Sequence, residues 1–321
     1  MKALITGGAG YIGSTVSNYL IDEGHKVTII DNLSTGLVKN IPKKADFYKI
    51  DISNTKELQK IFLKKKIDIV FHFAAFVDNM ESIKNPNKYY KNNFDKGKIF
   101  FNTCIKNKVN KFIYSSTAAV YCSKKKKISE KDILKPESPY SKSKLKLEKF
   151  LTKRKNKIDC IILRYFNVAG IETKLRCGFN IKKGQNLILN LCKALIKDKI
   201  FLINGSDYRT IDGSTIRDYI HVEDLAKIHF LSANLLMKKK MFQIFNCGYG
   251  YGFTVKQILK KFSLVSKKKI KFKVGKRRPG DIVISIANPN KLIKFIKWKP
   301  RYNKSLHIIK SSLKWYKKMS N

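Results

Sequence analysis

The sequence predicts an α/β fold, in the form of a doubly wound parallel sheet with a smaller C-terminal lobe. Short apolar segments alternate with helical patterns through the first half of the chain, which is typical of parallel strands joined by covering helices. A cluster of glycines directly follows the first apolar segment, as in folds that turn tightly from a strand into a helix. With 321 residues, the chain is long enough for one large domain and a smaller lobe.

The predicted strands of the first half are short apolar runs bounded by turn residues. They cover residues 2–6, 26–31, 47–50, 68–73, 111–116 and 159–164. Between these runs, apolar residues recur at the spacing of one helix face. The predicted helices cover 11–23, 54–65 and 87–107, and one more begins at Ser138-Pro139.

After about residue 168 this alternation becomes less regular. Polar and glycine-containing stretches at 177–186 and 204–215 predict loops. The regular elements expected in this half are a helix over 221–236, a strand over 242–246, and helices near 254–264 and 303–317.

No internal repeat or long linker interrupts the chain. We therefore expect a first domain over 1–167 and a smaller lobe over 168–321, with a segment near 215–246 packing back onto the first domain. No apolar run reaches the length of a membrane span, so no membrane partner is expected. The N-terminus lacks the apolar stretch of a signal peptide, which favours a cytoplasmic protein.

The formal net charge is +45, from 68 Lys and Arg against 23 Asp and Glu. One interpretation is nucleic-acid binding. The favoured interpretation is a compositional bias, because lysine is spread along the whole chain and no nucleic-acid motif with interleaved aromatics is present. We expect no specific nucleic-acid partner, although the charge should attract anionic ligands such as nucleotides.

Six cysteines are present, and none of them form a C-x-x-C pair or lie near a His at metal-ligand spacing. Free thiols in a reducing compartment are the simpler interpretation. We therefore expect no metal site.

The glycine cluster predicts a Rossmann-type dinucleotide site. Gly7, Gly10 and Gly13 lie between the first strand and the first helix, where glycine lets backbone N–H groups approach a pyrophosphate at a helix N-terminus. The alternative is a glycine-rich turn without a ligand. Asp31 ends the second strand, where a carboxylate would accept from ribose hydroxyls and repel a 2′-phosphate, so NAD is favoured over NADP. Its alternative role is that of a turn residue before Asn32.

Two further groups of residues are candidates for the site. Asp51-Ile52 follows the third strand and could contact the adenine edge, with a helix N-cap as the alternative. Tyr140 and Lys144 lie four residues apart on one face of a predicted helix. A nearby ammonium and a positive nicotinamide ring would lower the tyrosine pKa, so that Tyr140 could act as a base.

A run of hydroxyl side chains, Ser115-Ser116-Thr117, ends the fifth strand. Such a hydroxyl could bond to a substrate hydroxyl or shuttle its proton. Strand-end capping is the alternative for one or two of the three.

The sequence resembles the extended short-chain dehydrogenase/reductase superfamily and, within it, the UDP-glucose 4-epimerase (UDP-galactose 4-epimerase) family. The matching motifs run in order over nearly the whole chain. Those that support the superfamily are Thr6–Ser14, Asp31–Leu33, His72–Ala75, Tyr89–Asn93, Ser115–Tyr121, Ser138–Lys144 and Leu163–Asn167. Those that favour the epimerases are Asp212–Ala226 and Arg277–Asp281.

The resemblance implies an isomerase with NAD bound throughout its cycle. Tyr140 would take the proton of the sugar 4-hydroxyl while hydride leaves C4, with Thr117 bridging that hydroxyl and Lys144 holding the nicotinamide ribose. The 4-keto sugar would then rotate, and hydride would return to its opposite face. The residues implied for the cofactor are Gly7, Gly10, Tyr11, Ile12, Gly13, Asp31, Asn32, Asp51, Ile52, Phe73, Ala74, Ala75, Asn93, Ser115, Tyr140, Lys144 and Phe166.

The resemblance also implies a site for a UDP-sugar in the C-terminal lobe. Arg217 and Arg278 would bind the diphosphate and Asp281 a uridine ribose hydroxyl; for Arg217, a structural pair with Asp218 or Glu223 is the alternative. The residues implied for the substrate are Thr117, Tyr140, Asn167, Asn186, Arg217, Arg278, Asp281 and Ser285. A homodimer is implied through helices near 87–107 and 138–153.

Some positions depart from the family pattern. Cys122 replaces a usual Gly, and Asn204 stands where a Phe often faces uracil. The small Ser285 would leave room for a 2-acetamido group, so a UDP-N-acetylglucosamine 4-epimerase, or another nucleotide-sugar enzyme of the superfamily, is an alternative. Ala118 follows Thr117 where a 4,6-dehydratase needs an acid, which argues against dehydration. A non-catalytic scaffold or RNA binder is the more distant alternative, motivated by the charge.

Overall fold

The computed structural model describes residues 1–121, 127–182, 186–278 and 281–320. Its centre is a seven-stranded sheet in the order β11-β6-β5-β4-β1-β2-β3, with every pairing parallel. The strands are β1 (Lys2–Thr6), β2 (Lys26–Ile30), β3 (Asp46–Tyr48), β4 (Ile69–His72), β5 (Lys111–Thr117), β6 (Asp159–Tyr165) and β11 (Phe242–Cys247). The predicted fold class is confirmed.

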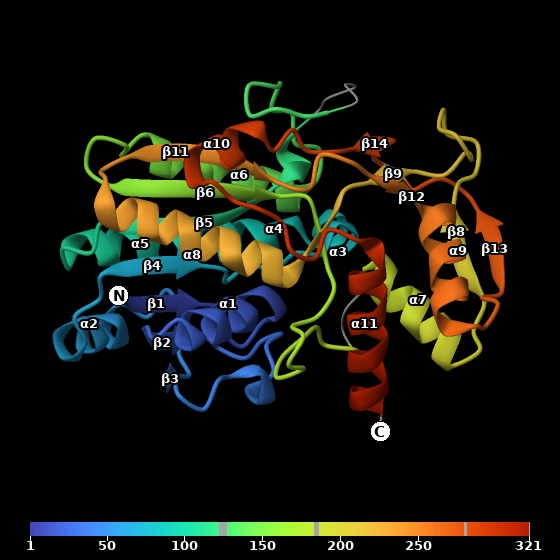
Figure 1. The fold of residues 1–321 in the computed structure, drawn as a ribbon. Coiled ribbons are helices and arrows are strands. Elements are labelled where there is room, and N and C mark those ends of the chain that lie inside the picture. Colours follow the sequence, from blue (N-terminus) through green and yellow to red (C-terminus); the bar gives the residue numbers. More distant parts are fainter. Residues whose placement is uncertain (122–126, 183–185, 279–280, 321) are drawn as a thin grey trace.

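Helices cover both faces of this sheet because alternate strand residues point to opposite sides (Figure 1). In β1, Ala3 and Ile5 pack in the core that includes Val16 of α1 (Tyr11–Asp22) and Leu225 of α8 (Val222–Lys238). Leu4, between them, packs in the opposite core. That second core is formed by α2 (Thr55–Lys64), α5 (Gly97–Lys106) and α6 (Pro139–Thr152).

The helix predicted over 87–107 is divided into three segments. It consists of α4 (Pro86–Tyr89), a π-helical stretch η2 (Tyr90–Lys96) and α5, and a short helix α3 (Asn79–Lys84) precedes it. A π-helical stretch turns side chains away from the positions of a regular helix and is frequent at functional sites.

The strand order reverses between β1 and β4, which are neighbours although β2 and β3 follow β1 in the chain. Ligands of doubly wound sheets bind at such a point, beyond the carboxyl ends of the strands. The loops that leave β1 and β4 therefore frame the position expected for a ligand.

The C-terminal lobe has its own apolar core, which includes Leu189, Phe262 and Trp315. Figure 1 shows this lobe beside the central sheet, with α11 on the side of the lobe toward the sheet. Its elements are α7 (Leu187–Ile196), β8 (Phe201–Asn204), α9 (Val255–Ser266), β13 (Phe272–Gly275) and α11 (Ser305–Ser320). The division into two domains stays a prediction, while α8 and β11 pack with the central sheet.

Short strands connect the two parts. β10 (Tyr219–His221) pairs with β7 (Asn167–Ala169), and β9 (Ile216–Arg217) pairs with β12 (Phe253–Thr254) and β14 (Ile284–Ser285). The remaining elements are η1 (Val38–Asn40), η3 (Ala118–Val120) and α10 (Asn290–Ile296).

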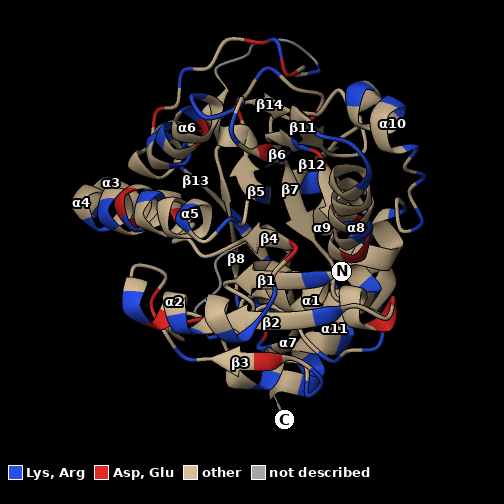
Figure 2. Cartoon of the chain, turned by 90° about the vertical axis from the view of Figure 1, so that its left-hand side faces the viewer, with Lys and Arg blue, Asp and Glu red and all other residues tan. Residues whose placement is uncertain are grey.

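The described part of the chain includes no helix long and apolar enough to cross a membrane, and it holds no group of three His, Cys, Asp or Glu suited to a metal ion. Its five cysteines are free and buried, and Cys122 lies outside the described residues. Figure 2 shows Lys and Arg spread over many helices and loops rather than gathered in one patch.

Candidate active site

The glycine turn after β1 is packed too closely to hold side chains. Gly7 has φ +71°, and a Cβ there would lie 2.7 Å from the backbone nitrogen of Ala74. A Cβ at Gly13 would lie 2.3 Å from the carbonyl oxygen of Gly7. Gly10 precedes α1 and provides no side-chain cap, so N–H groups of the first turn stay available to an anion. These residues fit the pyrophosphate of a dinucleotide.

Asp31 links the turn after β2 to the glycine turn. Its Oδ2 accepts from the N–H of Ala9 at 3.0 Å, and its Oδ1 accepts from the N–H of Leu33 at 2.8 Å. Burial raises the pKa of Asp31 above its usual value, and these two hydrogen bonds offset only part of that rise. Asp31 therefore has the turn role considered as the alternative, and a carboxylate still has lone pairs to accept from a ribose.

Asn32 and Asp51 meet beside this turn, where the Asn32 amide donates to Asp51 at 3.0 Å. Lys96 also donates to Asp51, at 2.6 Å. Burial alone would raise the pKa of Asp51, but hydrogen bonds from Lys96 and Ser53 lower it to about 2. The N-cap of α2 is Asn54, so Asp51 does not have the capping role of its alternative.

The loop after β4 begins at Phe73 and continues through Ala74 and Ala75 over the glycine turn. Asn93 of η2 braces it by accepting from the N–H of Phe76 and donating to its carbonyl, both at 2.9 Å. The same amide donates to Ser143 of α6 at 3.2 Å. Asn93 thus connects the loop to the helix that carries Tyr140.

The predicted catalytic residues lie together at the start of α6 and the end of β5. Ser138 caps α6 and Pro139 occupies its first turn, which places the buried Tyr140 and Lys144 on the face toward the sheet. Tyr140 is hydrogen-bonded to Thr117. Thr117 also caps η3 by accepting from the N–H of Ala119 at 3.1 Å.

Burial shifts both ionisable groups of this pair toward their neutral forms. It raises the pKa of Tyr140, which the hydrogen bond to Thr117 partly offsets. It lowers the pKa of Lys144 to about 7, although Glu148 favours the charged form. The Lys144 ammonium lies 4.5 Å from the centre of the Tyr114 ring. In the protein by itself, burial thus decides the direction of the Tyr140 pKa shift, and the lowering expected from Lys144 together with the nicotinamide ring stays a prediction.

The predicted diphosphate residues each have a partner within the fold. Arg217 forms an ion pair with Asp281 at 2.6 Å, and not with either neighbour considered from the sequence. Asn204, with its amide oxygen turned toward Arg278, accepts two hydrogen bonds from that guanidinium at 3.0 and 3.1 Å. Both arginines are thus held in place on the substrate side.

Asn167 and Ser285 lie near Arg217 through strand pairing. β7 pairs with β10 and begins at the exposed Asn167, which directly follows the buried Phe166. β14 pairs with β9 so that Ser285 lies opposite Arg217. The structure therefore brings these candidates together, although the sequence separates them widely.

The model of the NAD dependent epimerase/dehydratase family matches residues 3–248. The chain belongs to this family. It is 37% identical over 321 residues to the UDP-glucose 4-epimerase of Lactobacillus helveticus, covering 99% of the chain and 97% of that protein. The resemblance inferred from the motifs is confirmed.

Solved structures of relatives share the whole fold of this family member. A UDP-glucose 4-epimerase from Stenotrophomonas maltophila, with bound NAD and formylated UDP-arabinopyranose, superposes with a TM-score of 0.96 at 28% identity, over 100% of this chain and 99% of that one. A UDP-Glc/GlcNAc 4-epimerase from Campylobacter jejuni superposes with a TM-score of 0.86 at 35% identity, over 99% of both chains.

Asn186 of this family member lies at the start of α7. Its side chain caps α7 in the lobe by accepting from the N–H of Leu189 at 2.8 Å. Its local role is therefore that of a helix cap. Contact with a sugar or phosphate stays a prediction.

A buried ion pair behind the catalytic residues was missed from the sequence. Arg164 of β6 donates to Glu148 of α6, with 2.6 Å between the closest atoms, and both side chains are almost fully buried. Ser116 also donates to Glu148, and Arg164 donates to the hydroxyl of Tyr121 at 2.7 Å. The available signal was Glu148 one helical turn beyond Lys144, together with an arginine inside an apolar strand.

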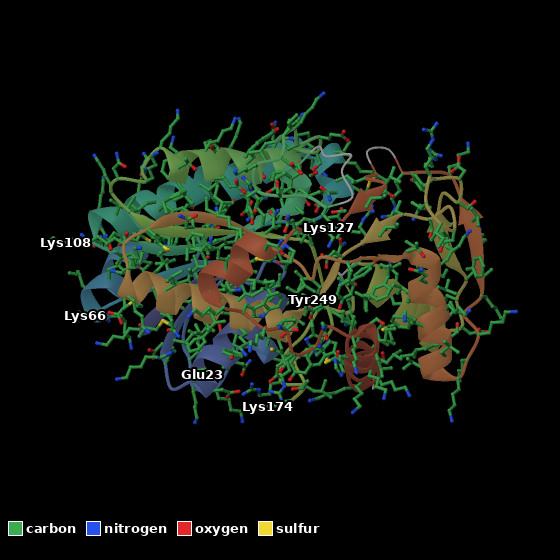
Figure 3. The ribbon with its side chains drawn as sticks, turned by 45° about the horizontal axis from the view of Figure 1, so that its top comes forward. Glu23, Lys66, Lys108, Lys127, Lys174 and Tyr249 are labelled. Atoms are coloured by element: carbon green, nitrogen blue, oxygen red, sulfur yellow. The ribbon has the colours of Figure 1, made fainter. Side chains whose placement is uncertain are left out.

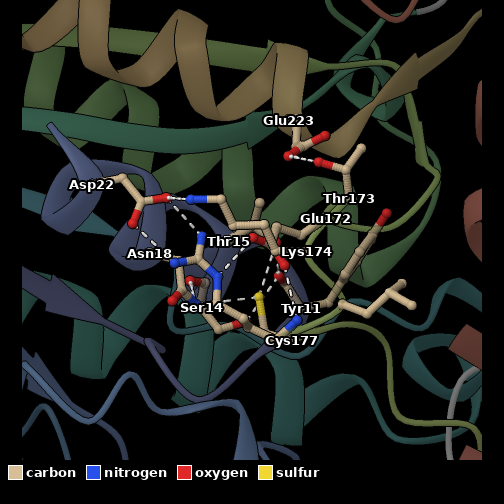
Figure 4. A network of polar contacts seen from close by, with 12 residues as sticks. Tyr11, Ser14, Thr15, Asn18, Asp22, Glu172, Thr173, Lys174, Cys177 and Glu223 are labelled. Carbon is tan, nitrogen blue, oxygen red and sulfur yellow. Dashed lines mark hydrogen bonds and ion pairs between the residues drawn. The ribbon is translucent and has the colours of Figure 1, made fainter. Parts of the chain in front are cut away.

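A second missed network ties α1 to the segment that enters the lobe (Figure 4). The Tyr11 hydroxyl donates to the carbonyl of Gly170, and Asn18 donates to the Cys177 sulfur at 3.4 Å. Arg176 bridges Asp22 and Glu172. Tyr11, predicted for the cofactor, thus also anchors the start of the lobe.

Proposed function

We propose that the protein is an NAD-dependent 4-epimerase that interconverts UDP-galactose and UDP-glucose through a transient 4-keto sugar. The observation that carries this proposal is the half-buried Thr117 with the buried Tyr140 and Lys144, together with a glycine turn fit for a dinucleotide. The relatives named as UDP-glucose 4-epimerases, similar over nearly the full length, support the same activity.

The proton chemistry of this proposal falls to residues of the chain. Tyr140 would accept the proton of the sugar 4-hydroxyl and later return it, with Thr117 holding that hydroxyl. The Lys144 ammonium would bond the nicotinamide ribose and favour the tyrosinate by its charge. When bound, NAD supplies the hydride acceptor and donor. Tyr140 needs this added positive charge, because burial alone raises its pKa.

Binding of the substrate would rest mainly on its UDP part. Arg217 and Arg278 would bind the diphosphate through their planar guanidinium groups, and Asp281 would accept from a uridine ribose hydroxyl. The ion pair of Arg217 with Asp281 keeps these two groups oriented before binding. Asn167 and Ser285 would face the sugar, which must turn between the two hydride transfers.

An N-acetylated UDP-sugar is a second candidate substrate. Ser285 is small and lies on β14 opposite Arg217, which favours room for a 2-acetamido group. The Campylobacter jejuni relative is named for both glucose and N-acetylglucosamine. We therefore include UDP-N-acetylglucosamine 4-epimerisation in the proposal.

The deciding experiment is incubation of the purified protein with UDP-galactose and, separately, with UDP-N-acetylgalactosamine. Products are resolved by chromatography without added reductant. Formation of UDP-glucose supports the main activity, and parallel conversion of the acetylated sugar supports the wider one. Bound NAD without conversion of either sugar would refute the epimerase and leave the family assignment intact.

We also propose a cytoplasmic homodimer formed through α5 and α6. A groove between these helices is lined by Phe94 and Phe150 and by the basic Lys98, Lys146 and Lys149. Apolar rings at a surface groove favour a protein partner, and a second copy satisfies this.

A further inference from the structure

Asp218 joins the strands that carry three of the proposed substrate residues. It directly follows Arg217 at the end of β9. Its N–H donates to the carbonyl of Ser285 at 3.0 Å, and its carbonyl accepts from the N–H of Asn167 at 2.9 Å. The backbone of this one residue therefore sets Arg217, Ser285 and Asn167 beside one another.

The carboxylate of Asp218 ties two further segments to the same point. Its Oδ1 accepts from the N–H of Tyr249 at 2.9 Å, after β11. Its Oδ2 accepts from the N–H of Gly250 at 2.9 Å and from the N–H of Ala287, after β14, at 3.2 Å. The residue is fully buried, and these three backbone N–H groups stabilise its negative charge in place of water.

The chain packs closely around this carboxylate. A Cβ at Gly248 would lie 2.5 Å from Oδ2 of Asp218 and 2.7 Å from the Cβ of Ala287. Such packing leaves no space for a side chain between position 248 and the carboxylate. A change in the hydrogen bonds of Asp218 should therefore move the segments that it joins.

We propose that Asp218 is a positioning residue for UDP-sugar binding, which lies out of reach of the substrate and fixes the relative positions of Arg217, Ser285 and Asn167. This inference rests on the proposed function, because it takes those three residues to face the substrate. Loss of the carboxylate would weaken UDP binding and leave NAD binding unchanged, since the glycine turn and Asp31 belong to other segments.

The protonation state of Asp218 provides an independent readout. Burial raises its pKa to about 6 against the lowering effect of its backbone hydrogen bonds. Protonation of either carboxylate oxygen of Asp218 would place an O–H where a backbone N–H now donates. That N–H would then lose its acceptor. UDP affinity should thus be full above pH 6 and fall as the pH drops through about 6.

Few other charged or titratable groups face Asp218 from the described residues. They are Lys127, whose charge lowers the pKa of Asp218, and the hydroxyl of Tyr251. Burial raises the pKa of Tyr251 to about 12, so this hydroxyl does not change charge in acid. Figure 3 shows Lys127 and Tyr249 in the middle of the molecule, toward the C-terminal lobe.

The test is calorimetric titration of NAD-loaded protein with UDP alone, for the wild type and Asp218→Asn. Asparagine keeps the size of the side chain but offers one acceptor oxygen and turns an NH2 group toward N–H donors. At about pH 8, we expect the Kd of UDP to rise at least about tenfold, with unchanged NAD content. The wild-type Kd should also rise more steeply below about pH 6 than the Kd of the variant, because protonation of the terminal phosphate of UDP affects both proteins alike.

Asp224→Asn is a matched control. Asp224 is an equally buried carboxylate, which accepts from the N–H groups of Arg301 and Tyr302 at 2.8 Å and from the hydroxyl of Tyr249 at 2.6 Å. It lies on α8 and joins no strand that carries a substrate residue. This variant should lose stability while its Kd for UDP and the acid dependence of that Kd stay as in the wild type.

The outcomes separate this inference from the proposed function. If the wild type converts UDP-galactose but Asp218→Asn binds UDP as tightly, the inference is wrong and the epimerase stands. If the wild type binds UDP, with the expected effects of pH and substitution, but converts no sugar, the inference stands and the epimerase fails. Absence of UDP binding by the wild type overturns both. Should the variant not fold, a pH-independent wild-type Kd overturns the inference.

Discussion

Single residues in the site show that a buried charge persists where it has a partner of opposite charge. Tyr140 and Lys144 are both shifted toward neutrality by burial. Arg164 is as deeply buried, and burial alone would lower its pKa, yet its pKa is raised because its hydrogen bonds and charge interactions with Glu148 and Tyr121 together outweigh burial. The reacting groups are therefore adjustable in charge, and the groups that support them are fixed.

Tyr140→Phe tests the proposed acid–base residue. The variant lacks the oxygen that would exchange a proton with the 4-hydroxyl, so kcat for UDP-galactose should fall by about 10²–10⁴-fold while NAD stays bound. Turnover is measured by chromatography, and NAD is measured after denaturation. Tyr89→Phe is the control, since its ring centre lies 6.5 Å from that of Tyr140 and it should keep most of the activity. Wild-type turnover by Tyr140→Phe would exclude its role.

Ser285→Leu tests the proposed space for an acetamido group. The larger side chain should reduce kcat/KM for UDP-N-acetylgalactosamine at least about tenfold more than that for UDP-galactose, because it would occupy the space of the acetyl group. Both sugars are assayed in parallel, and Ser285→Ala should retain both activities. An equal loss for the two sugars would mean that Ser285 does not determine this specificity.

At the scale of elements, α6 holds the catalytic residues through contacts along its length. Ser138 caps its first turn, Asn93 donates to Ser143, and Glu148 pairs with Arg164 of β6. The buried pair fixes α6 against β5 and β6, the strands at whose ends Thr117 and Phe166 lie. The position of Tyr140 relative to Thr117 thus depends on a contact two helical turns away.

Arg164→Met tests this contact. It leaves the Glu148 carboxylate buried without its partner, so the free energy of unfolding should fall by about 3–5 kcal/mol. Denaturant unfolding with saturating NAD measures it. Lys60→Met, which breaks the exposed pair with Glu57, should change stability by less than about 1 kcal/mol. If the two variants lose equal stability, the buried pair does not hold α6.

Apolar periodicity was sufficient to predict the elements of the central sheet. Its strands are buried on both faces, and each covering helix buries one continuous apolar face. Periodicity did not predict β9 or β14, because a strand of two residues is too short to show an alternation of apolar residues. It also merged α4, η2 and α5, because the seven residues of η2 are too few to show an apolar period of their own. Motifs gave Thr117, Tyr140 and Lys144, whereas Arg164 and Asp218 depend on partners far away in the sequence.

At the scale of the whole molecule, the positive charge bears on self-association. Lys and Arg occur on many elements (Figure 2), including the outer faces of α5 and α6. The proposed dimer would place Lys98, Lys146 and Lys149 of one copy near those of the other. The apolar rings of Phe94 and Phe150 favour contact, and like charges oppose it.

The dimer should therefore strengthen as salt is added. The Debye length, over which charges still repel one another, is about 30 Å at 0.01 M salt but only about 8 Å at 0.15 M. Repulsion between the lysine-rich faces is therefore largest at low ionic strength. Sedimentation equilibrium should give a lower dimer Kd at about 0.3 M NaCl than at about 0.02 M, because the Debye length shortens. Lys146→Glu with Lys149→Glu should dimerise more tightly than the wild type at low salt, and Lys267→Glu, at the end of α9 in the C-terminal lobe, should not. A dimer that weakens with salt, or a monomer at every concentration of salt, would rule out an interface through α5 and α6.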